Sequence, residues 1–197
     1  MDTLYVSARL QLSTGRLVLC APSIELAAET LAFYERNRTH LAPWEPARDP
    51  RFFTLTAQRA ALAVAVGNFE AQSAIRYWMR TREDPTQLVG HVSLSQIARG
   101  VSQSAMLGYA LEGACEGRGL MTEALGAVLA EVFSDRVGLH RVQANVRIEN
   151  ARSVRVLERL GFAHEGLARR YLFIDGAWRD HTMHALLNPV ERAVICV

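Results

Sequence analysis

Two glycines one residue apart, Gly117 and Gly119, lie between a strand-like run and a helix-like run. Residues 106–111 are apolar enough for a buried strand, and apolar side chains recur after the glycines at the spacing of one helix face. These side chains are Met121, Leu125, Val128, Leu129, Val132 and Phe133. Backbone N–H groups at a helix N-terminus stabilise anions, and glycine lets a ligand approach the backbone. The segment therefore predicts a phosphate or diphosphate site, although glycine at an ordinary strand-to-helix turn would explain it equally well.

Two familiar phosphate-binding loops are excluded. The spacing Gly117-x-Gly119-x-x-Thr122 is one residue away from the dinucleotide fingerprint, which also needs an acidic residue at the end of the next strand. Here the next acidic residues after this turn of the helix, Glu131 and Asp135, fall within the predicted helix or at its end. The pattern GxxxxGK[ST] does not occur, so the chain has no Walker loop.

A second segment follows closely and adds a polar turn. Residues 140–148 alternate between apolar and polar side chains, which predicts a strand. Asn150 then opens a helix that ends at Gly161, with Val154, Leu157 and Leu160 facing inward. Asn150 and Ser153 have the spacing of an ordinary N-cap, so a purely structural role is one interpretation of this pair. The other is a ligand site beside the two glycines.

Together, the strand, EGRGLMT, helix, strand, NxxS, helix and GF resemble the GCN5-related N-acetyltransferase (GNAT) family, which binds acetyl-CoA through these two segments. The likeness narrows to the RimJ/RimL type and to its RimJ branch, which acetylates the N-terminal alanine of a small-subunit ribosomal protein. It is carried by STGRLVL at 13–19, NRTHLAPWEPARD at 37–49, LGYALEGACEGRGLMTEAL at 107–125 and YLFIDGAWRDH at 171–181. The resemblance covers most of the chain, from about Thr14 to Leu187.

The resemblance implies which residues hold acetyl-CoA. The backbone of Tyr109, Ala110 and Leu111 would bond the pantetheine arm and the thioester carbonyl. Asn150 would hold the pantetheine arm, and Ser153 would give a proton to the departing sulfur. The residues expected around the diphosphate are Glu116, Gly117, Arg118, Gly119, Leu120, Met121 and Thr122.

The chain also departs from the family pattern. The family loop reads Q/R-x-x-G-x-G/A, whereas Glu116 takes the first position and Met121 the last. Methionine is common in the RimJ/RimL type, but a carboxylate is unfavourable beside a diphosphate, so Glu116 is expected to point outward. In RimL-type relatives a carboxylate proposed as general base precedes Tyr-Leu of the penultimate strand. Arg170 occupies that position here, so no base carries over from it.

The implied reaction needs a neutral amine. A protein α-amino group has a pKa of about 8, against about 10.4 for a lysine side chain. A weak base is therefore enough to take the proton of an N-terminal amine. Glu45 and Asp180 are the first candidate bases, with Glu112 and His181 as alternatives. Trp44, Tyr171 and Trp178 are expected to line the acceptor site beside Glu45. Ordinary loop, hairpin and packing contacts are the competing interpretation for each of these residues.

The predicted function is transfer of an acetyl group from acetyl-CoA to a primary amine, first of all the N-terminal α-amine of a protein such as a ribosomal protein with alanine or serine at its end. One alternative acceptor is a small-molecule amine, an amino-acid conjugate or a toxic peptide-nucleotide. A second alternative is an acyl-CoA-binding module without catalysis.

Composition sets outer limits on this hypothesis. With 197 residues, 50% hydrophobic and 21% charged, the chain is predicted to form one domain over residues 1–197. A net charge of +2 gives no reason to expect nucleic acid or a membrane as partner. Three cysteines and six histidines lack metal-site spacing, so no metal or disulfide is expected. No signal or membrane-spanning segment is evident, which predicts a cytoplasmic protein, as a monomer or homodimer.

The predicted fold is an α/β three-layer α/β/α sandwich around a mixed, mainly antiparallel sheet. Strands are expected at 16–20, 75–80, 88–97, 102–111, 140–148, 171–174 and 181–187, with a bend at Gly90. Helices are expected from Pro22-Ser23 through Tyr34 and over 56–70. The proline-containing stretch 37–50 is predicted as a loop, and Asp175-Gly176 as a hairpin turn.

Overall fold

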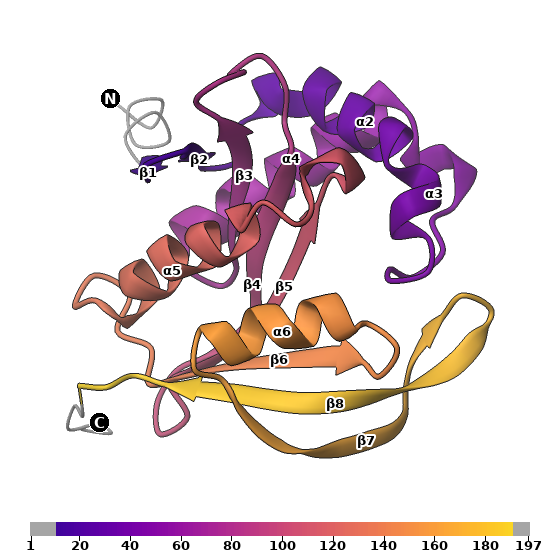
Figure 1. Cartoon of the computed structure of the whole chain (residues 1–197). Helices are drawn as coiled ribbons and strands as arrows, with labels where there is room; N and C mark the ends of the chain where they lie inside the picture. Colours follow the sequence, from indigo (N-terminus) through magenta and orange to yellow (C-terminus); the bar gives the residue numbers. More distant parts are fainter. Residues whose placement is uncertain (1–10, 191–197) are drawn as a thin grey trace.

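A sheet with helices on both faces forms the body of the molecule in the computed structural model, which describes residues 11–190 (Figure 1). Within this range eight strands follow the order β1-β2-β3-β4-β5-β6-β8-β7. Their bounds are β1 Gln11–Ser13, β2 Leu17–Cys20, β3 Ile75–Thr81, β4 Gly90–Ala98, β5 Ser104–Leu111, β6 Arg141–Arg147, β7 Ala163–Ile174 and β8 Ala177–Leu187. In this sheet β5 and β6 are parallel, and the other neighbouring pairs are antiparallel. The mixed, mainly antiparallel architecture predicted from the sequence is confirmed.

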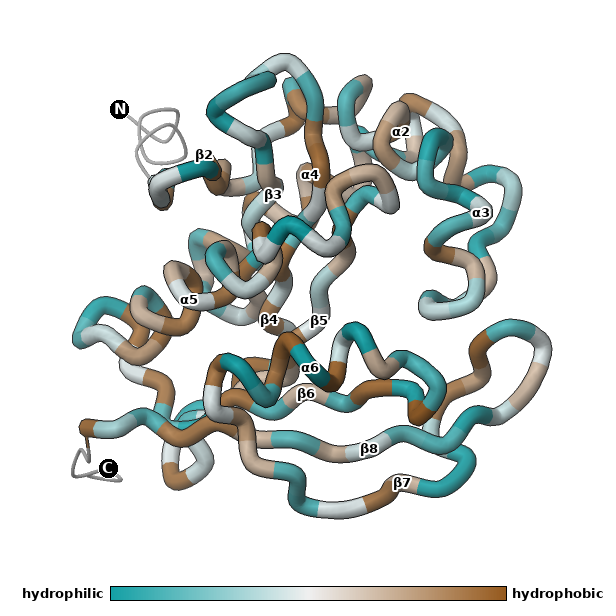
Figure 2. The backbone as a smooth tube through the Cα atoms, viewed as in Figure 1, coloured by the Kyte–Doolittle hydropathy of each residue, from teal (hydrophilic) through white to brown (hydrophobic). Residues whose placement is uncertain are grey.

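The helices form two layers with separate apolar cores. On one face, α2 (Ala27–Arg36) and α4 (Leu55–Glu70) pack with Trp78 in a core that includes Phe33 and Leu62. On the other face, α5 (Leu120–Phe133) and α6 (Ala151–Arg159) cover the sheet. Figure 2 shows α5 as predominantly hydrophobic, which matches its many buried side chains. The shorter elements are η1 Ile24–Leu26, α3 Arg38–Leu41, η2 Pro50–Phe52 and η3 Gly113–Cys115.

The parallel ladder between β5 and β6 is short. It joins four residue pairs, from Ser104–Arg141 to Leu107–Ala144. Beyond Leu107, β5 pairs only with β4, and beyond Ala144, β6 pairs only with β8. Figure 1 shows the two strands meeting near their beginnings and diverging toward their ends. The backbone groups that β5 and β6 would otherwise share are therefore left without ladder partners over these last residues.

Gly90 begins its strand instead of lying inside it as expected. It is the first residue of β4 and lies opposite Leu111 at the end of β5. A Cβ atom at Gly90 would lie 2.5 Å from the carbonyl oxygen of Ala110. Glycine is required here because two backbones approach closely.

Two other predictions of local structure are wrong in part. The stretch 37–50 contains a short helix, α3, because its prolines begin only at Pro43 and the buried Asn37 side chain donates to the Phe33 carbonyl. The closing hairpin is much longer than predicted, since β7 starts at Ala163 and β8 at Ala177. Most of β7 is exposed, so it lacks the apolar alternation that marks a strand in sequence. Trp178 and Asp180 thus belong to a strand, while the Asp175-Gly176 turn is confirmed by its positive φ angles.

His91 is buried among aromatic rings beneath α2. Its side chain is 6% exposed, and its ring centroid lies 5.1 Å from Trp78 and 6.2 Å from Phe33. Neither ring nitrogen has a hydrogen-bond partner within the described part of the chain. Burial, with smaller effects from Arg76 and Arg48, holds the pKa of His91 well below 6.5. The folded protein therefore keeps this imidazole neutral at pH values where the unfolded chain binds a proton.

The linkage gives a pH-dependent stability. Above about pH 6.5 His91 is neutral in both the folded and the unfolded chain, and it does not reduce the free energy of unfolding. Below that pH the unfolded chain binds a proton that the folded protein does not, so the free energy of unfolding falls by at most about 1.4 kcal/mol per pH unit. We expect His91→Phe to keep the free energy of unfolding near pH 7.5 within about 1 kcal/mol of wild type, because it keeps an aromatic ring and removes two buried nitrogens that have no hydrogen-bond partner in the described part of the chain. Between pH 6.5 and 5 it should lose less stability than wild type, as measured by urea unfolding. The exposed His140→Gln is the control, and equal slopes for wild type and His91→Phe would contradict the assignment.

Candidate active site

The two glycines form the turn that the sequence predicts. Gly117 and Gly119 have φ angles of +73° and +74°, in the left-handed region that favours glycine. Gly119 is the N-cap of α5, and no side chain caps this helix. Nothing lies within 4 Å of a Cβ built at Gly117. The Thr122 hydroxyl is buried in the first turn without a hydrogen-bond partner among the described residues. An uncapped helix end, an unpartnered hydroxyl and an open backbone together suit a bound anion.

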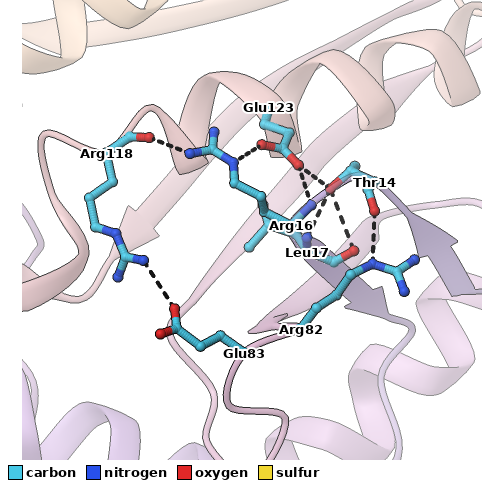
Figure 3. Close-up of polar contacts among 7 residues, drawn as sticks. All are labelled: Thr14, Arg16, Leu17, Arg82, Glu83, Arg118 and Glu123. Carbon is cyan, nitrogen blue, oxygen red and sulfur yellow. Dashed lines mark hydrogen bonds and ion pairs between the residues drawn. The ribbon is translucent and has the colours of Figure 1, made fainter.

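Arg16, which the sequence reasoning did not single out as a site residue, supports this loop from outside (Figure 3). Its Nη1 donates to the Arg118 carbonyl at 2.8 Å, and its Nε donates to Glu123 Oε2 at 2.6 Å. Arg118 in turn forms an ion pair with Glu83 at 3.3 Å. The loop is thereby joined to the start of β2 and to the turn after β3. The signal in the sequence was the stretch STGRLVL, which contains Arg16 and carries part of the family resemblance.

Glu123, in the first turn of α5, is the anchor of this support. Its Oε1 accepts hydrogen bonds from the Thr14 hydroxyl at 2.5 Å and from the Arg16 backbone N–H at 2.8 Å. The Thr14 hydrogen bond, followed by the contacts from Arg16, lowers the pKa of Glu123. A carboxylate in the first turn is also favoured by the helix dipole. Residues 14–16 are thus fixed to the helix that begins at the two glycines.

Glu116 bridges neighbouring elements instead of reaching into solvent. Its carboxylate forms a close ion pair with Arg152 of α6, and its Oε1 lies 3.6 Å from His40 Nε2 of α3. The first position of the loop is therefore tied to α6 by opposite charges, and its carboxylate lies beside the His40 imidazole of α3. The sequence identified Glu116 as a departure from the family pattern but gave no means of finding its partners.

The residues expected to bond the pantetheine arm lie on the diverging part of β5. Tyr109, Ala110 and Leu111 pair with β4 and have no partner on β6. Ala110 packs into the core beneath α2, whereas Tyr109 and Leu111 pack against the core beneath α5 and α6. The edge that faces β6 offers backbone donors and acceptors to a ligand.

Asn150 and Ser153 meet at the start of α6. The side-chain oxygen of Asn150 accepts from the Ser153 backbone N–H at 3.1 Å, so the N-cap interpretation of this pair is confirmed. The Ser153 hydroxyl lies 2.5 Å from the Tyr109 hydroxyl. Burial raises the pKa of Tyr109 to about 12, and the hydrogen bond to Ser153 opposes part of that shift. The side chain of Tyr109 was not among the sequence predictions, which used only its backbone.

Both of the first candidate bases have partners. Asp180 Oδ1 accepts from the Arg170 backbone N–H at 2.7 Å, at a bulge where Arg170 has a φ of +47°. A carboxylate of β8 therefore lies beside Arg170, the β7 position at which the family resemblance implies a carboxylate. Glu45 forms an ion pair with Arg48 at 3.1 Å. Asp180 thus has the hairpin contact that was its structural interpretation, and it remains a candidate base on the strength of its position.

Arg147, at the end of β6, joins the predicted acceptor elements. Its Nη1 donates to the Pro43 carbonyl at 2.6 Å, and its guanidinium lies 5.6 Å from the centre of the Trp44 ring. It also pairs with Glu149 at 2.8 Å and lies 3.7 Å from Asp175 in the hairpin turn. With a side chain only 11% exposed, it brings the segment after α3 close to the β7–β8 turn.

The other aromatic residues predicted for the acceptor site lie on the hairpin. Tyr171 packs against the buried His181 at 5.5 Å, and Trp178 packs against Phe173 at 5.8 Å. Trp178 is 59% exposed, so much of its indole is available for contact. The structure brings Trp44 to Arg147 and keeps Tyr171 and Trp178 with their own strand neighbours.

Residues 11–190 contain neither a metal-ligand cluster nor a membrane-spanning helix. No three His, Cys, Asp or Glu side chains in this range are arranged to hold a metal ion. Likewise, none of the helices described here is long and apolar enough to cross a membrane. Cys20 and Cys115 are free thiols, and Cys196 lies outside the described residues.

Known proteins are similar to this chain in sequence and architecture. Residues 16–163 match the family described as Acetyltransferase (GNAT) domain. The chain is 35% identical over 181 residues to the [ribosomal protein uS5]-alanine N-acetyltransferase of Escherichia coli K12, with 92% of each chain covered. The crystal structure of ribosomal-protein-S5-alanine acetyltransferase from Vibrio fischeri is similar with a TM-score of 0.87 and 30% identity, covering 91% of this chain and 97% of that one.

A second solved structure contains a ligand. Mycobacterium smegmatis RimJ in complex with CoA-disulfide is similar with a TM-score of 0.80 and 30% identity, covering 87% of this chain and 81% of that one. The family match extends over the two-glycine loop, the diverging strands and the turn that holds Asn150 and Ser153. On this evidence the chain belongs to the GNAT acetyltransferase family.

Proposed function

We propose that this protein transfers the acetyl group of acetyl-CoA to the N-terminal α-amine of a ribosomal protein, with alanine or serine as the first residue. Acetyl-CoA as the cosubstrate is supported by the uncapped N-terminus of α5, which follows Gly117 and Gly119. The observation that carries the acceptor is the similarity to the E. coli uS5-alanine enzyme over nearly the whole of both chains.

In this proposal the diphosphate of coenzyme A binds to backbone N–H groups of residues 117–122, and the Thr122 hydroxyl donates to it. The pantetheine arm runs along the free edge of β5 at Tyr109–Leu111. Asn150 uses its side-chain oxygen as a helix cap, so its NH₂ group is the part left to hold the pantetheine. The loop residues Glu116, Arg118, Leu120 and Met121 shape the same site.

The same elements would serve the acetyl transfer. A backbone N–H of β5 polarises the thioester carbonyl, and one such donor is worth about 3 to 4 kcal/mol in the transition state. The amine nitrogen attacks that carbonyl carbon, the C–S bond breaks, and the sulfur takes a proton from the Ser153 hydroxyl. Ser153 suits this role because its backbone N–H is fixed by Asn150 at the first turn of α6.

The acceptor side is assigned to the segment after α3 and the β7–β8 hairpin. Trp44, Tyr171 and Trp178 line this side, and Glu45 or Asp180 takes the proton released by the amine, directly or through water. Asp180 is supported by its place beside residue 170, and Glu45 by its place next to Trp44. An α-amine with a pKa near about 8 is partly neutral at physiological pH, so positioning of the two substrates supplies much of the acceleration.

The proposal is tested with synthetic peptides that copy the first residues of ribosomal proteins. We expect acetylation at the α-amine of peptides that begin with alanine or serine, detected by mass spectrometry and by release of free coenzyme A. The value of kcat/KM should rise with pH up to about 8 and then level off, because the neutral amine is the nucleophile. The same peptides with a blocked N-terminus are the control. Small free amines that outperform every peptide would reject the acceptor, and intact CoA binding without any transfer would reject catalysis.

Arg16→Ala tests the support of the diphosphate loop. The substitution removes the hydrogen bond to the Arg118 carbonyl, and we expect the KM for acetyl-CoA to rise about fivefold, equivalent to about 1 kcal/mol for a partly exposed contact. The kcat should stay within about twofold, because Arg16 does not reach the reacting atoms. Arg82→Ala is the matched control, since Arg82 bonds the Thr14 carbonyl without touching the loop. Equal effects of both substitutions would assign Arg16 to general anchoring of the first strands.

Glu116→Gln tests the unusual first residue of the loop. Removing its charge takes an anion away from the bound diphosphate and releases Arg152, so we expect the KM for acetyl-CoA to fall about two- to fourfold. The gain should shrink at high salt, because charges near the surface are screened. Glu165→Gln is the control. It breaks the ion pair between Glu165 of β7 and Arg141 of β6, and it should leave the KM for acetyl-CoA unchanged. A rise in KM would instead show that the bridge of Glu116 to Arg152 and His40 shapes the loop for binding.

A further inference from the structure

The side chain of Tyr109 makes a contact that its expected backbone role does not explain. Tyr109 lies on β5 two residues beyond the last β5–β6 pair. Its hydroxyl reaches the first turn of α6, 2.5 Å from the Ser153 hydroxyl oxygen and 3.3 Å from the Ser153 carbonyl oxygen. One phenol therefore connects the two elements that diverge around the proposed thioester position.

The acidity of the two hydroxyls indicates which one donates. A phenol is a much stronger acid than an aliphatic alcohol, and it remains so with the pKa of Tyr109 raised to about 12. The alcohol oxygen is correspondingly the better acceptor. The favoured arrangement has the single phenol proton of Tyr109 donated to Ser153 Oγ, the nearer oxygen at 2.5 Å, and not to the Ser153 carbonyl at 3.3 Å. In that arrangement the serine keeps its own proton for another acceptor.

The backbone of Ser153 is fixed as well. Its N–H donates to the Asn150 side chain at 3.1 Å, which places the residue at a defined position in the helix end. With the N–H held by Asn150 and the hydroxyl oxygen held by Tyr109, one group of Ser153 remains free to act, namely its hydroxyl proton. An unsupported serine hydroxyl would divide its time among rotamers.

We propose that Tyr109 is a positioning residue that donates a hydrogen bond to Ser153 Oγ and so directs the serine proton to the sulfur of the departing coenzyme A. This inference rests on the proposed function of Ser153 and adds to it. As the C–S bond breaks, the sulfur gains the Ser153 proton, and Ser153 regains one from water. Tyr109 keeps its proton throughout and stabilises the serine oxygen while that oxygen carries negative charge.

The test compares Tyr109→Phe, Ser153→Ala and the double variant, with an alanine-first peptide as acceptor. We expect Tyr109→Phe to lower kcat about tenfold while the KM for acetyl-CoA stays within about twofold. Ser153→Ala should lower kcat further, and the double variant should equal Ser153→Ala, because Tyr109 acts only through the serine. Tyr77→Phe is the matched control, since it removes a buried phenol hydroxyl that contacts Arg136 away from the site.

The outcomes that contradict the inference differ from those that contradict the proposed function. Wild-type kcat in Tyr109→Phe beside an impaired Ser153→Ala overturns the inference alone. A double variant slower than Ser153→Ala by the tenfold factor also overturns it, because Tyr109 would then act independently. Wild-type kcat in Ser153→Ala overturns the role proposed for Ser153 and the inference with it, while acetyl transfer itself stands. CoA binding without any transfer in the wild-type protein overturns the proposed function. Melting temperatures and calorimetric CoA affinities show whether each variant is folded.

A second measurement keeps the tyrosine in place. A fluorinated tyrosine at position 109 preserves the ring and lowers the phenol pKa, so the donor proton is lost at lower pH than in wild type. We expect the high-pH limb of the kcat profile to move to lower pH. An unchanged profile would overturn the donor assignment even where Tyr109→Phe folds poorly.

Discussion

The site depends on a parallel strand pair whose hydrogen bonding stops after four residue pairs. Because β5 and β6 separate beyond Leu107 and Ala144, each strand keeps an unpaired edge near its carboxyl end. The α5 and α6 helices both follow these ends, so their N-termini lie where the strands diverge (Figure 1). Helix N-termini and free strand edges are both groups that bind a ligand through the backbone. A long, flexible and anionic molecule with a polar amide arm matches such a surface better than a compact one does.

The loop at the head of α5 owes its shape to parts of the chain far from it in sequence. Glu123 holds Thr14 and Arg16, and Arg16 returns to the Arg118 carbonyl in the loop (Figure 3). A helix end with no side-chain cap and two glycines in the left-handed region is not held in one conformation by local contacts. The contacts from the first strands hold it in one conformation, which connects these strands to the loop proposed to bind the cosubstrate.

Local signals in the sequence were sufficient for the loop and for most elements. The two glycines, the apolar spacing of α5 and the Asn150–Ser153 cap are short-range patterns, and the structure has them as predicted. The partners of Glu116, the reach of Tyr109 to Ser153 and the anchoring by Arg16 join residues that are 36 to 107 positions apart. No periodicity encodes such pairs. The strand β7 was underestimated for another reason, because an exposed edge strand buries too few side chains to show alternation.

Arg147 links three stretches of the chain through one guanidinium, which contacts the Pro43 carbonyl, Glu149 and Asp175. The proposed acceptor surface is consequently formed by several segments and not by a single loop. Replacing only the stretch around Trp44, or only the hairpin turn, by the segment of a homologue with a different acceptor specificity would remove some of the contacts of Arg147. A change of acceptor specificity is therefore expected to require exchange of both segments together, with Arg147 retained because it contacts both.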